Sequence, residues 1–572
     1  MAQFKTDLAD IYFNLFKMNK VQDHTNDYGE DEMRDIIDQF NKFTENEIYP
    51  TRMVGDAEGV KLVDGNVKVP ACFHGPHKQF YENGWYALGY PEDIGGMPAP
   101  HAISIVCNSI AIGANVSFSM YYGLTRGAMN VIHQIGSQEQ KDLYVTKMME
   151  GAWGGTMCLT EPGAGSDVGA AGSTAAPLDG GKYSIKGVKI FISSGESDLY
   201  ENNIHLVLAR TPGAPKGSKG LSLFIVPRFN VEDNSNNNVV CTKLEEKMGI
   251  HASATCELTF GQGGECIGEM IGEENAGMAN MFIMMNEARL LCGLQGESQG
   301  NLAFMLTEQY ARERVQFGTE ICNLPDVKRT LLKMRAVSRG MRALTLYTGN
   351  LFDLEAKGDE VAAKEIALLT PICKAYCSDE GFNVSVDAVQ VHGGYGFCTE
   401  YGIEQFIRDT KIASIYEGTN GIQAIDFVSR KILKDQGKTF FALGKKIQAI
   451  MSTDEAKEFS HEIAMIGKSM EMSQKVVEKF GKMAMEKNEI GILAHATDFL
   501  NYCGNLVVSW LLLEHACLAK KEMDKTSSED EKKYYRTKIV DFKVFCQYQL
   551  VKNIGIGNSV LNFENNLAEL EL

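Results

Sequence analysis

The sequence has no excess of basic residues. Its 56 Lys and Arg residues are outnumbered by 74 Asp and Glu residues, which gives a formal net charge of −18 at pH 7. The diffuse positive surface that is typical of proteins binding nucleic acids or anionic membranes is therefore missing. We expect no nucleic acid among the partners of this protein.

The sequence also lacks dense cysteine spacing and a leader-like start. Its 14 Cys residues are spread from Cys72 to Cys546, and residues 1–20 do not combine a charged segment, an apolar core and a cleavage site. We therefore expect a cytoplasmic protein with free thiols. Residues 94–125 contain no Asp, Glu, Lys or Arg, but Gly, Pro, Asn and Ser interrupt the stretch. A buried helix is favoured over a membrane span, and we expect no integral membrane association.

Metal-binding and phosphate-loop patterns are missing as well. Cys373 and Cys377 lie four residues apart on one face of an expected helix, but no second Cys or His pair stands at ligand spacing. We therefore expect no metal site. The phosphate loop G-x-x-x-x-G-K-[ST] does not occur.

Length and apolar pattern predict a mainly α protein with an inserted β domain. At about 150 residues per domain, 572 residues correspond to three or four domains. Apolar and polar residues alternate along 183–192, as is typical of a strand, and a slip at Gly187 suggests a bulge. Short apolar runs that are typical of strands follow at 205–210, 221–226 and 254–260. The predicted domains are an N-terminal helical domain at 1–156, a mostly antiparallel β domain at 157–274, a helical bundle domain at 275–432 and a C-terminal helical extension at 433–572.

A glycine-rich segment opens the predicted β domain. Residues 157–169 read MCLTEPGAGSDVG, in which three glycines stand near the hydroxyls of Thr160 and Ser166. Such a loop lets the backbone approach a planar polar ring or a phosphate closely. It is not a dinucleotide fingerprint, because strands rather than a βαβ unit follow it. A plain glycine loop between two elements is an equal alternative on this motif alone.

A carboxylate stands at a second predicted turn. In IYEGTNGIQ, residues 415–423, Gly418 and Gly421 separate two apolar runs. Glu417 is therefore expected at a turn, with its carboxylate directed at whatever the turn faces. For an isolated acidic residue, the alternative is a solvated surface charge.

Two further segments contain ligand-binding residue types. HGGYGF at 392–397, preceded by Gln390, is a glycine cluster between helical segments that either admits a ligand or allows a close helix crossing. RERVQFG at 312–318 ends a predicted helix. There Arg314 suits a phosphate and Phe317 suits stacking on a base, and a solvated basic helix end is the alternative.

Taken in this order, the segments resemble the acyl-CoA dehydrogenase family of flavoenzymes. The resemblance covers residues 80–430 and rests on LTEPGAGSD, KIFIS, RVQFG, QVHGGYGF and EYGIEQFIRDTKIASIYEGTNGIQ. It implies the family's helical, β-barrel and four-helix-bundle architecture, here with an added C-terminal helical domain. The long tail is similar to that of a larger subgroup that includes 3-(methylthio)propanoyl-CoA dehydrogenase.

The resemblance implies a FAD-dependent oxidoreductase with Glu417 as its catalytic base, which removes the proton α to the thioester while the β hydrogen leaves as hydride to flavin. Some members of the family carry the base at another position, which is Ala288 in this sequence. The neighbouring Glu287 is therefore a weaker alternative base, one residue away from that position. Residues matched to cofactor contacts are Met157, Leu159, Thr160, Ser166, Phe191, Ser193, Arg314, Gln316, Phe317, Gln390, Gly393, Gly394 and Thr419. Residues matched to substrate contacts are Ser166, Arg289, Glu417 and Gly418. Phe191 and Ser193 stand where the family commonly has Trp and Thr.

The family's chemistry implies oxidation of an acyl-CoA to a trans-2-enoyl-CoA, with 3-(methylthio)propanoyl-CoA or another short acyl-CoA as the expected substrate. A broad-chain fatty acyl-CoA dehydrogenase, an acyl-CoA oxidase and a non-catalytic nucleic-acid-binding relative are the alternatives. The implied partners are an electron-transferring flavoprotein and a second copy of the chain, in a homodimer or higher homo-oligomer, because the family's cofactor site borrows residues from a neighbouring subunit.

Overall fold

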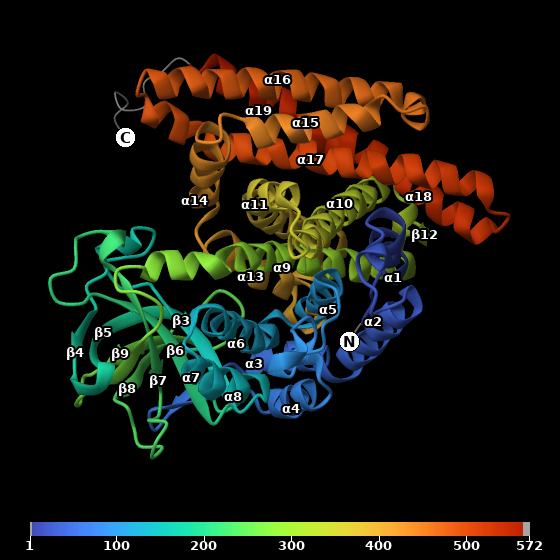
Figure 1. The fold of residues 1–572 in the computed structure, drawn as a ribbon. Coiled ribbons are helices and arrows are strands. Elements are labelled where there is room, and N and C mark those ends of the chain that lie inside the picture. The colour runs from blue at the N-terminus through green and yellow to red at the C-terminus, as the bar shows by residue number, and fades with distance from the viewer. Residues whose placement is uncertain (1–2, 564–572) are drawn as a thin grey trace. The chain divides into compact units, whose positions relative to one another are not determined.

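The computed structural model describes residues 3–563 (Figure 1), and for residues 282–286 it describes the backbone but not the side chains. The chain divides into two compact units. The helical unit combines Met1–Asp35, Pro100–Ser109 and Arg289–Leu572, and the β unit combines Ile36–Ala99 and Ile110–Ala288. A helix-rich protein with an inserted β domain confirms the predicted fold class.

The β unit is built around an eight-stranded sheet with the order β3-β6-β7-β10-β5-β9-β8, in which β4 pairs with β5. β3 and β6 run parallel, and the remaining pairs of this sheet are antiparallel, as predicted. The strands are β3 (Trp153–Cys158), β4 (Thr174–Pro177), β5 (Lys182–Ser193), β6 (Asn202–Ala209), β7 (Ser222–Pro227), β8 (Val239–Leu244), β9 (Thr255–Phe260) and β10 (Ile267–Met270). A separate hairpin joins β1 (Lys61–Val63) to β2 (Asn66–Lys68).

The irregularity in β5 lies later than the alternation predicts. Gly187 keeps a regular register with Phe260, and the register shifts between Lys189 and Ile192, where Phe191 has a φ of +59°. The prediction of a bulge at Gly187 is therefore wrong. Glycine is needed there for close packing instead, because a Cβ would lie 2.1 Å from the hydroxyl oxygen of Ser173.

Helix α6 supports the start of the sheet by packing against β3. The Thr125 hydroxyl accepts a hydrogen bond from the backbone N–H of Gly155 at 3.1 Å. The predicted capping box of Ser137 and Gln140 is confirmed at the start of α7. Helices of the β unit are α3 (Thr51–Glu58), α4 (His74–Glu82), α6 (Val116–Ile135), α7 (Gln138–Gln140) and α8 (Thr146–Met149). The chain passes from one unit to the other within α2 (Glu30–Phe43), just before α5 (His101–Ala114) and again within it, and within α9 (Gly277–Glu313).

The helical unit contains the long helices α10 (Pro325–Glu355) and α11 (Glu360–His392). The tail adds α15 (Lys438–Met451), α16 (Ser460–Met485), α17 (Glu489–Lys525), α18 (Glu529–Phe545) and α19 (Lys552–Asn562). Figure 1 shows α15, α16 and α17 running side by side, and α17 and α18 pack against α10. The turn between α17 and α18 confirms the charged hairpin that the sequence indicates at 520–533.

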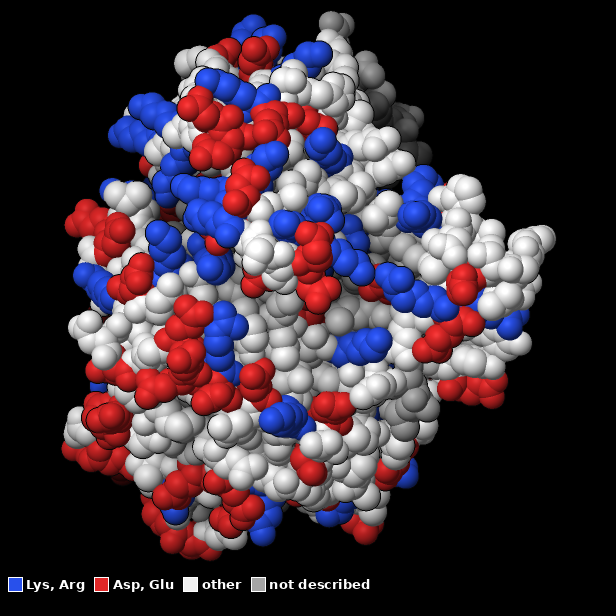
Figure 2. Space-filling view, turned by 90° about the vertical axis from the view of Figure 1, so that its right-hand side faces the viewer, with Lys and Arg blue, Asp and Glu red and all other residues white. Residues whose placement is uncertain are grey.

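Helix α17 is long and apolar enough, by length and composition alone, to cross a membrane. However, 89% of its most apolar window is buried inside the structure, as in the core helix of a bundle. Among the described residues, no other helix meets the same criteria. On the surface, basic and acidic side chains are interspersed over the face displayed in Figure 2.

Buried charges fasten the N-terminal segment to the C-terminal helices. Asp10, in α1 (Leu8–Tyr12), is fully buried and accepts hydrogen bonds from Lys538 of α18 and from Arg342 Nη1 of α10, the latter at 2.9 Å. Arg339 lies 3.9 Å from the same carboxylate and pairs with Asp541 at 2.8 Å. Burial alone would raise the pKa of Asp10, but Lys538, Arg339 and Arg342 together hold it well below its usual value.

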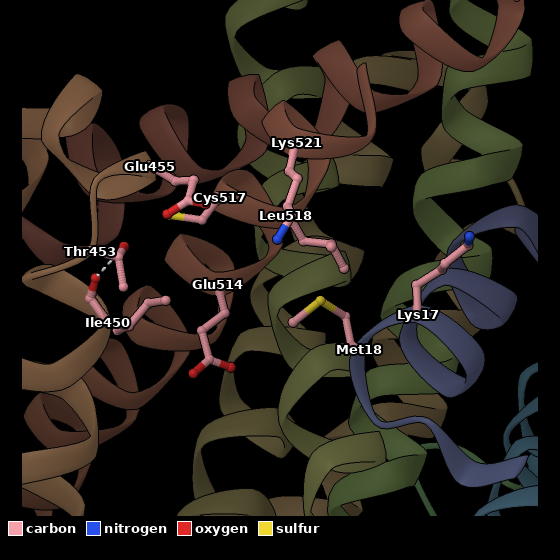
Figure 3. Close-up of a pocket in the computed structure, with 9 residues that line it drawn as sticks. All are labelled: Lys17, Met18, Ile450, Thr453, Glu455, Glu514, Cys517, Leu518 and Lys521. Atoms are coloured by element: carbon pink, nitrogen blue, oxygen red, sulfur yellow. Dashed lines mark hydrogen bonds between the residues drawn. The ribbon is translucent and has the colours of Figure 1, made fainter. Parts of the chain in front are cut away.

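A pocket of about 290 Å³ lies among the helices of the tail (Figure 3). Its lining residues come from the N-terminal segment, from the end of α15 and the segment up to the start of η15 (Glu455–Phe459), and from α17. They are Lys17, Met18, Ile450, Thr453, Glu455, Glu514, Cys517, Leu518 and Lys521. Glu514 accepts a hydrogen bond from the Trp510 indole N–H at 2.9 Å. Burial raises the pKa of Glu514 to about 7, against the smaller opposing effects of the Trp510 hydrogen bond and of Lys446.

Replacing Glu514 with glutamine should stabilise the protein at alkaline pH. The folded-state pKa is raised from 4.5 to about 7, so the stabilisation given by the protonated carboxyl is lost as the pH rises through this window. At pH 8, Glu514→Gln should increase the free energy of unfolding by up to about 3 kcal/mol, and the gain should shrink towards zero near pH 4.5.

Urea unfolding at both pH values measures this difference. The exposed Glu486, which directly follows α16, provides a matched Glu→Gln control that should leave the unfolding midpoint nearly unchanged at either pH. An effect of Glu514→Gln that is equal at the two pH values would contradict the titration of this carboxylate near pH 7.

Candidate active site

Glu417 stands on a tight turn between η13 (Lys411–Ser414) and α14 (Asn420–Ile425). Glu417 and Gly418 both have left-handed backbones, with φ of +55° and +78°. A non-glycine residue in this conformation is strained, and such residues cluster at functional sites. Thr419 caps α14, since its hydroxyl accepts a hydrogen bond from the backbone N–H of Ile422 at 3.2 Å. The turn that the glycine spacing predicts is confirmed.

Helix α11 anchors this turn. Lys374 Nζ donates to the carbonyl oxygen of Gly418 at 2.7 Å and to Asn420 Oδ1 at 2.9 Å. Gln423 Nε2 donates to the carbonyl oxygen of Glu417 at 3.0 Å. Among the described residues, the Glu417 carboxylate and the backbone N–H groups of Glu417 and Gly418 have no hydrogen-bond partner. The anchors therefore leave the chemically active groups of the turn available.

The surroundings of Glu417 favour a carboxylate that can take up a proton. Its side chain is half-buried, and burial raises its pKa above the ordinary value of 4.5. The positive charges of Lys374 and Arg289 oppose this increase. A general base works best when its pKa lies closer to the working pH, so burial moves Glu417 in the direction that proton abstraction requires.

Arg289, the matched substrate contact on α9, faces another carboxylate. It is 6% exposed, and its Nη1 atom donates to Asp426 Oδ2 at 3.0 Å. The Tyr416 hydroxyl donates to Gln295 Oε1, which ties the residue before the base to the same helix. Arg289 therefore lies close enough to act on Glu417 electrostatically, while its guanidinium is held by Asp426.

The glycine-rich segment forms the loop after β3 in the β unit. Met157, Leu159 and Thr160 are half-buried, and Ser166 is exposed. The carbonyl oxygen of Thr160 accepts a hydrogen bond from the Ile190 N–H at 2.9 Å, which holds the start of the loop beside β5. The chain then reverses at Pro162 and Gly163, where the backbones of residues 161 and 164 exchange hydrogen bonds of 3.1 and 2.9 Å.

A buried ion pair that the sequence reasoning missed stabilises this loop. Lys189 of β5 is fully buried and donates to Glu161 Oε1 at 2.7 Å and to the carbonyl oxygen of Leu159 at 3.0 Å. Glu161 also accepts hydrogen bonds from the backbone N–H groups of Gly172 and Ser173 at 2.7 and 3.1 Å. The sequence feature that could have revealed this pair is the position of Lys189 along the strand, four residues after Ile185, which places it on the inward face of β5 with apolar residues.

The β-unit residues suit a bound flavin. Phe191 is 60% exposed on the bulge of β5, so its ring is free to pack against a planar group. The hydroxyls of Thr160 and Ser193 have no hydrogen-bond partner among the described residues. Gly163 and Gly165 face open space, with no atom within 4 Å of a Cβ placed on either. An accessible aromatic ring, free hydroxyls and an open glycine loop suit the isoalloxazine ring of FAD and the phosphates of the same cofactor.

The RVQFG segment forms a hairpin at the end of α9 in the helical unit. β11 (Val315–Gln316) and β12 (Thr319–Glu320) pair through the two-residue loop Phe317–Gly318. Both loop residues have positive φ, +54° and +78°, as a type I′ turn requires. Phe317 is 92% exposed. A strained turn that presents an aromatic ring to the outside is typical of a binding element.

The structure brings this hairpin and the HGGYG segment together. The Arg314 guanidinium lies 5.2 Å from the ring centroid of Tyr395. Gln390, Gly393 and Gly394 are exposed at the C-terminal end of α11, and both glycines face open space. The two segments that are matched to the FAD diphosphate and adenine therefore lie beside each other in the helical unit. Glu417, Gly418 and Thr419 lie elsewhere in the same unit.

Glu287, the alternative base, lies in the β unit on α9. Its Oε2 atom accepts a hydrogen bond from Asn130 Nδ2 at 3.0 Å. Unlike Glu417, this carboxylate therefore already has a partner. The chain also contains one G-x-S-x-G match, Gly296–Gly300, but it lies inside α9 rather than at a strand-to-helix turn, so no nucleophile elbow forms.

This chain is similar to known proteins along most of its length. The acyl-CoA dehydrogenase N-terminal, middle and C-terminal domains match residues 30–152, 156–262 and 275–433, and an acetyl-CoA dehydrogenase C-terminal-like domain matches residues 443–571. The 3-methylmercaptopropionyl-CoA dehydrogenase of Ruegeria pomeroyi is 36% identical, with 91% of each chain covered. The broad-specificity linear acyl-CoA dehydrogenase FadE5 of Mycobacterium tuberculosis is 33% identical over 100% of this chain and 99% of its own.

The fold is also shared with solved structures. An acyl-CoA dehydrogenase from Bacillus anthracis, solved in complex with FAD, superposes with a TM-score of 0.76 at 23% identity, covering 94% of this chain and 90% of its own. Four matching domains and close relatives that extend over nearly the whole sequence agree with one another. This chain belongs to the acyl-CoA dehydrogenase family.

Proposed function

We propose that this protein uses bound FAD to oxidise a short acyl-CoA to the trans-2-enoyl-CoA, with 3-(methylthio)propanoyl-CoA as the preferred substrate. Glu417 carries the proposal: it is half-buried on a left-handed turn, burial raises its pKa, and its carboxylate has no hydrogen-bond partner among the described residues. The substrate preference is supported by the relative that is 36% identical and is named for this activity.

The residues proposed to hold FAD fall into two groups. In the β unit, Met157, Leu159 and Thr160 with Phe191 and Ser193 would hold the flavin ring, and Ser166 would lie near the phosphates. In the helical unit, Arg314, Gln316 and Phe317 with Gln390, Gly393, Gly394 and Thr419 would hold the diphosphate and adenine. When bound, FAD accepts the β hydrogen of the acyl chain as hydride. The FAD complex of the Bacillus anthracis neighbour supports this cofactor.

Glu417 would take the proton from the carbon α to the thioester. As this proton leaves, negative charge develops on the thioester oxygen, and donors aimed at that oxygen stabilise it. The backbone N–H groups of Glu417 and Gly418 have no partner among the described residues and would serve as such donors. Base and oxyanion donor are then supplied by the same turn.

The proposed partners are a second copy of this chain and an electron-transferring flavoprotein. Phe317 and Phe397 of the helical unit are 92% and 84% exposed, and exposed aromatic rings of this kind are common at interfaces. In the family, the hairpin that carries Phe317 reaches the cofactor of a neighbouring subunit, which supports a homodimer or higher oligomer. A cytoplasmic location stays a prediction.

A broad-chain fatty acyl-CoA dehydrogenase is the second candidate function. The observation that favours it is the likeness to the broad-specificity enzyme of Mycobacterium tuberculosis, which extends over all of this chain. The two candidates differ in the acyl chains accepted, not in the reaction.

Anaerobic reduction of the yellow enzyme by a series of thioesters tests the proposal. We expect 3-(methylthio)propanoyl-CoA to bleach the flavin with the highest second-order rate constant for reduction, followed by butanoyl-CoA, with octanoyl-CoA and palmitoyl-CoA much slower. Equal values across the series would favour the broad-chain enzyme. Fast peroxide release in air without another acceptor would indicate an oxidase, and no bleaching by any thioester would refute the proposed reaction.

A further inference from the structure

Helix α11 carries a buried lysine beside the turn that bears Glu417. Lys374 is fully buried, and no carboxylate among the described residues lies within 4 Å of its ammonium group. Its two hydrogen bonds, of 2.7 and 2.9 Å, go to neutral oxygens of Gly418 and Asn420. A buried ammonium is costly unless negative charge balances it, so this lysine requires an explanation.

Anchoring alone does not require a charged residue at this position. Asn420 Nδ2 already binds α11 through the carbonyl oxygen of Ala375 at 3.3 Å, Ser378 Oγ at 3.1 Å and Asp379 Oδ1 at 2.9 Å. A neutral donor on α11 would complete the anchor at Gly418. What a lysine adds is its positive charge.

Among the positive charges near Glu417, that of Lys374 has the largest effect on the pKa of its carboxyl group. The charged and titratable groups near Glu417 are Arg289 and Cys292 on α9, Lys374 on α11 and the adjacent Tyr416, with Asp379 beyond the lysine. Arg289 already pairs with Asp426, whereas Lys374 has no ion pair among the described residues. Burial lowers the pKa of Lys374, and Cys292, Glu417 and Asp379 oppose that decrease. Lysine and base therefore stabilise each other's charged forms.

We propose that Lys374 is a positioning residue for the reaction: it holds the strained Glu417–Gly418 turn on α11 and supplies the positive charge that balances the Glu417 carboxylate. The inference rests on the proposed function, because it takes Glu417 as the base. Without the lysine, burial would keep Glu417 protonated to higher pH, and the turn would lose its contact at Gly418.

Three substitutions separate charge from anchoring. Lys374→Gln keeps amide donors and removes the charge, Lys374→Met removes both, and Lys374→Arg keeps the charge. A matched control is Lys538→Met, which removes another fully buried lysine of the helical unit that contacts Asp10 instead. Thermal unfolding and flavin content of each purified holoenzyme show whether the protein remains folded and loaded.

Two pH profiles measure the effect. The first is the rate of anaerobic flavin reduction, and the second is carbodiimide labelling of Glu417 in substrate-free protein, read by peptide mass spectrometry. An opposite charge nearby lowers a carboxyl pKa by about 1–3 units. Lys374→Gln and Lys374→Met should therefore move both midpoints upward by about one pH unit or more, and at a pH well below the wild-type midpoint the reduction rate should fall about tenfold. Lys374→Arg and Lys538→Met should keep both midpoints.

Midpoints in Lys374→Gln equal to those of the wild type would overturn the inference, even if stability falls, because a merely structural lysine would produce that result. If neither neutral variant folds, Lys374→Arg decides: an unchanged labelling midpoint supports the inference, because arginine keeps the positive charge, and a shifted midpoint would overturn it. The proposed function is tested separately by Glu417→Gln. If substrate reduces the flavin of this variant at the wild-type rate, Glu417 is not the base. If Glu417→Gln is inactive and the Lys374 midpoints do not move, only the inference about Lys374 is wrong.

Discussion

Glu417→Gln should keep the yellow flavin bound but lower the rate of substrate-dependent flavin reduction by about 10²–10⁴-fold, the usual contribution of a general base. Glutamine has the shape of glutamate and cannot accept the α proton. The anchors of the turn run through the carbonyl oxygens of Glu417 and Gly418 and through Asn420. Since none of them uses the carboxylate, the substitution should leave the turn in place.

Stability measurements separate loss of chemistry from loss of structure. Because burial raises the pKa of Glu417, the ionised carboxylate opposes folding at neutral pH, and its stabilising protonated form is lost as the pH rises through the folded pKa. Glu417→Gln should therefore be at least as stable as the wild type at pH 7. Stopped-flow reduction and thermal unfolding measure the two effects on the same sample.

Glu287→Gln is the matched control for the base. Glu287 accepts a hydrogen bond from Asn130 at 3.0 Å, and glutamine keeps an oxygen that accepts it. We expect this variant to retain most of its activity. Retained bleaching in Glu417→Gln together with lost bleaching in Glu287→Gln would assign the base to Glu287 instead.

Asp10→Asn should destabilise the helical unit by about 3–5 kcal/mol, the usual effect of removing one partner from a buried charge cluster. The carboxylate of Asp10 faces Lys538, Arg342 and Arg339, and an amide leaves these cations without their shared counter-ion. Because the folded pKa of Asp10 is lowered, its contribution is present above the unfolded pKa and is lost only as the pH falls through the folded value. The effect should therefore persist from pH 5 to pH 8.

Hydrogen exchange locates this effect. Amides of α1 and of the following η1 (Phe13–Met18) should exchange faster in Asp10→Asn, since these elements are fastened through Asp10. Asp454, whose side chain is 90% exposed and pairs with Lys457, provides an Asp→Asn control that should change neither exchange nor the unfolding midpoint. Unchanged exchange in α1 would show that the cluster does not hold the N-terminal segment.

The four strands with clear apolar patterns were predictable, and the rest were not. β6 and β7 are buried along their whole length, and each contains a run of four apolar residues, Leu206–Ala209 and Leu223–Val226. β3 contains Gly154 and Gly155, and β4 and β10 have four residues each, too few for an alternation to stand out. The bulge of β5 was assigned to Gly187 because glycine marks irregular strands, whereas the strain lies at Phe191.

The sequence by itself determined the order of the helical and β segments, the turn at Glu417 and the glycine-rich loop at residues 157–169, because these depend on local spacing and on residues that tolerate left-handed backbones. It did not reveal Lys374 or Lys189 as partners of the two loops. Lys374 meets Gly418 across 44 residues of sequence, and Lys189 meets Glu161 across 28. Only the packing of the folded chain excludes water from these two lysines and places Lys374 against the Glu417 turn and Lys189 against the glycine-rich loop. The tertiary structure alone therefore decided how the proposed base and the β-unit loop are held.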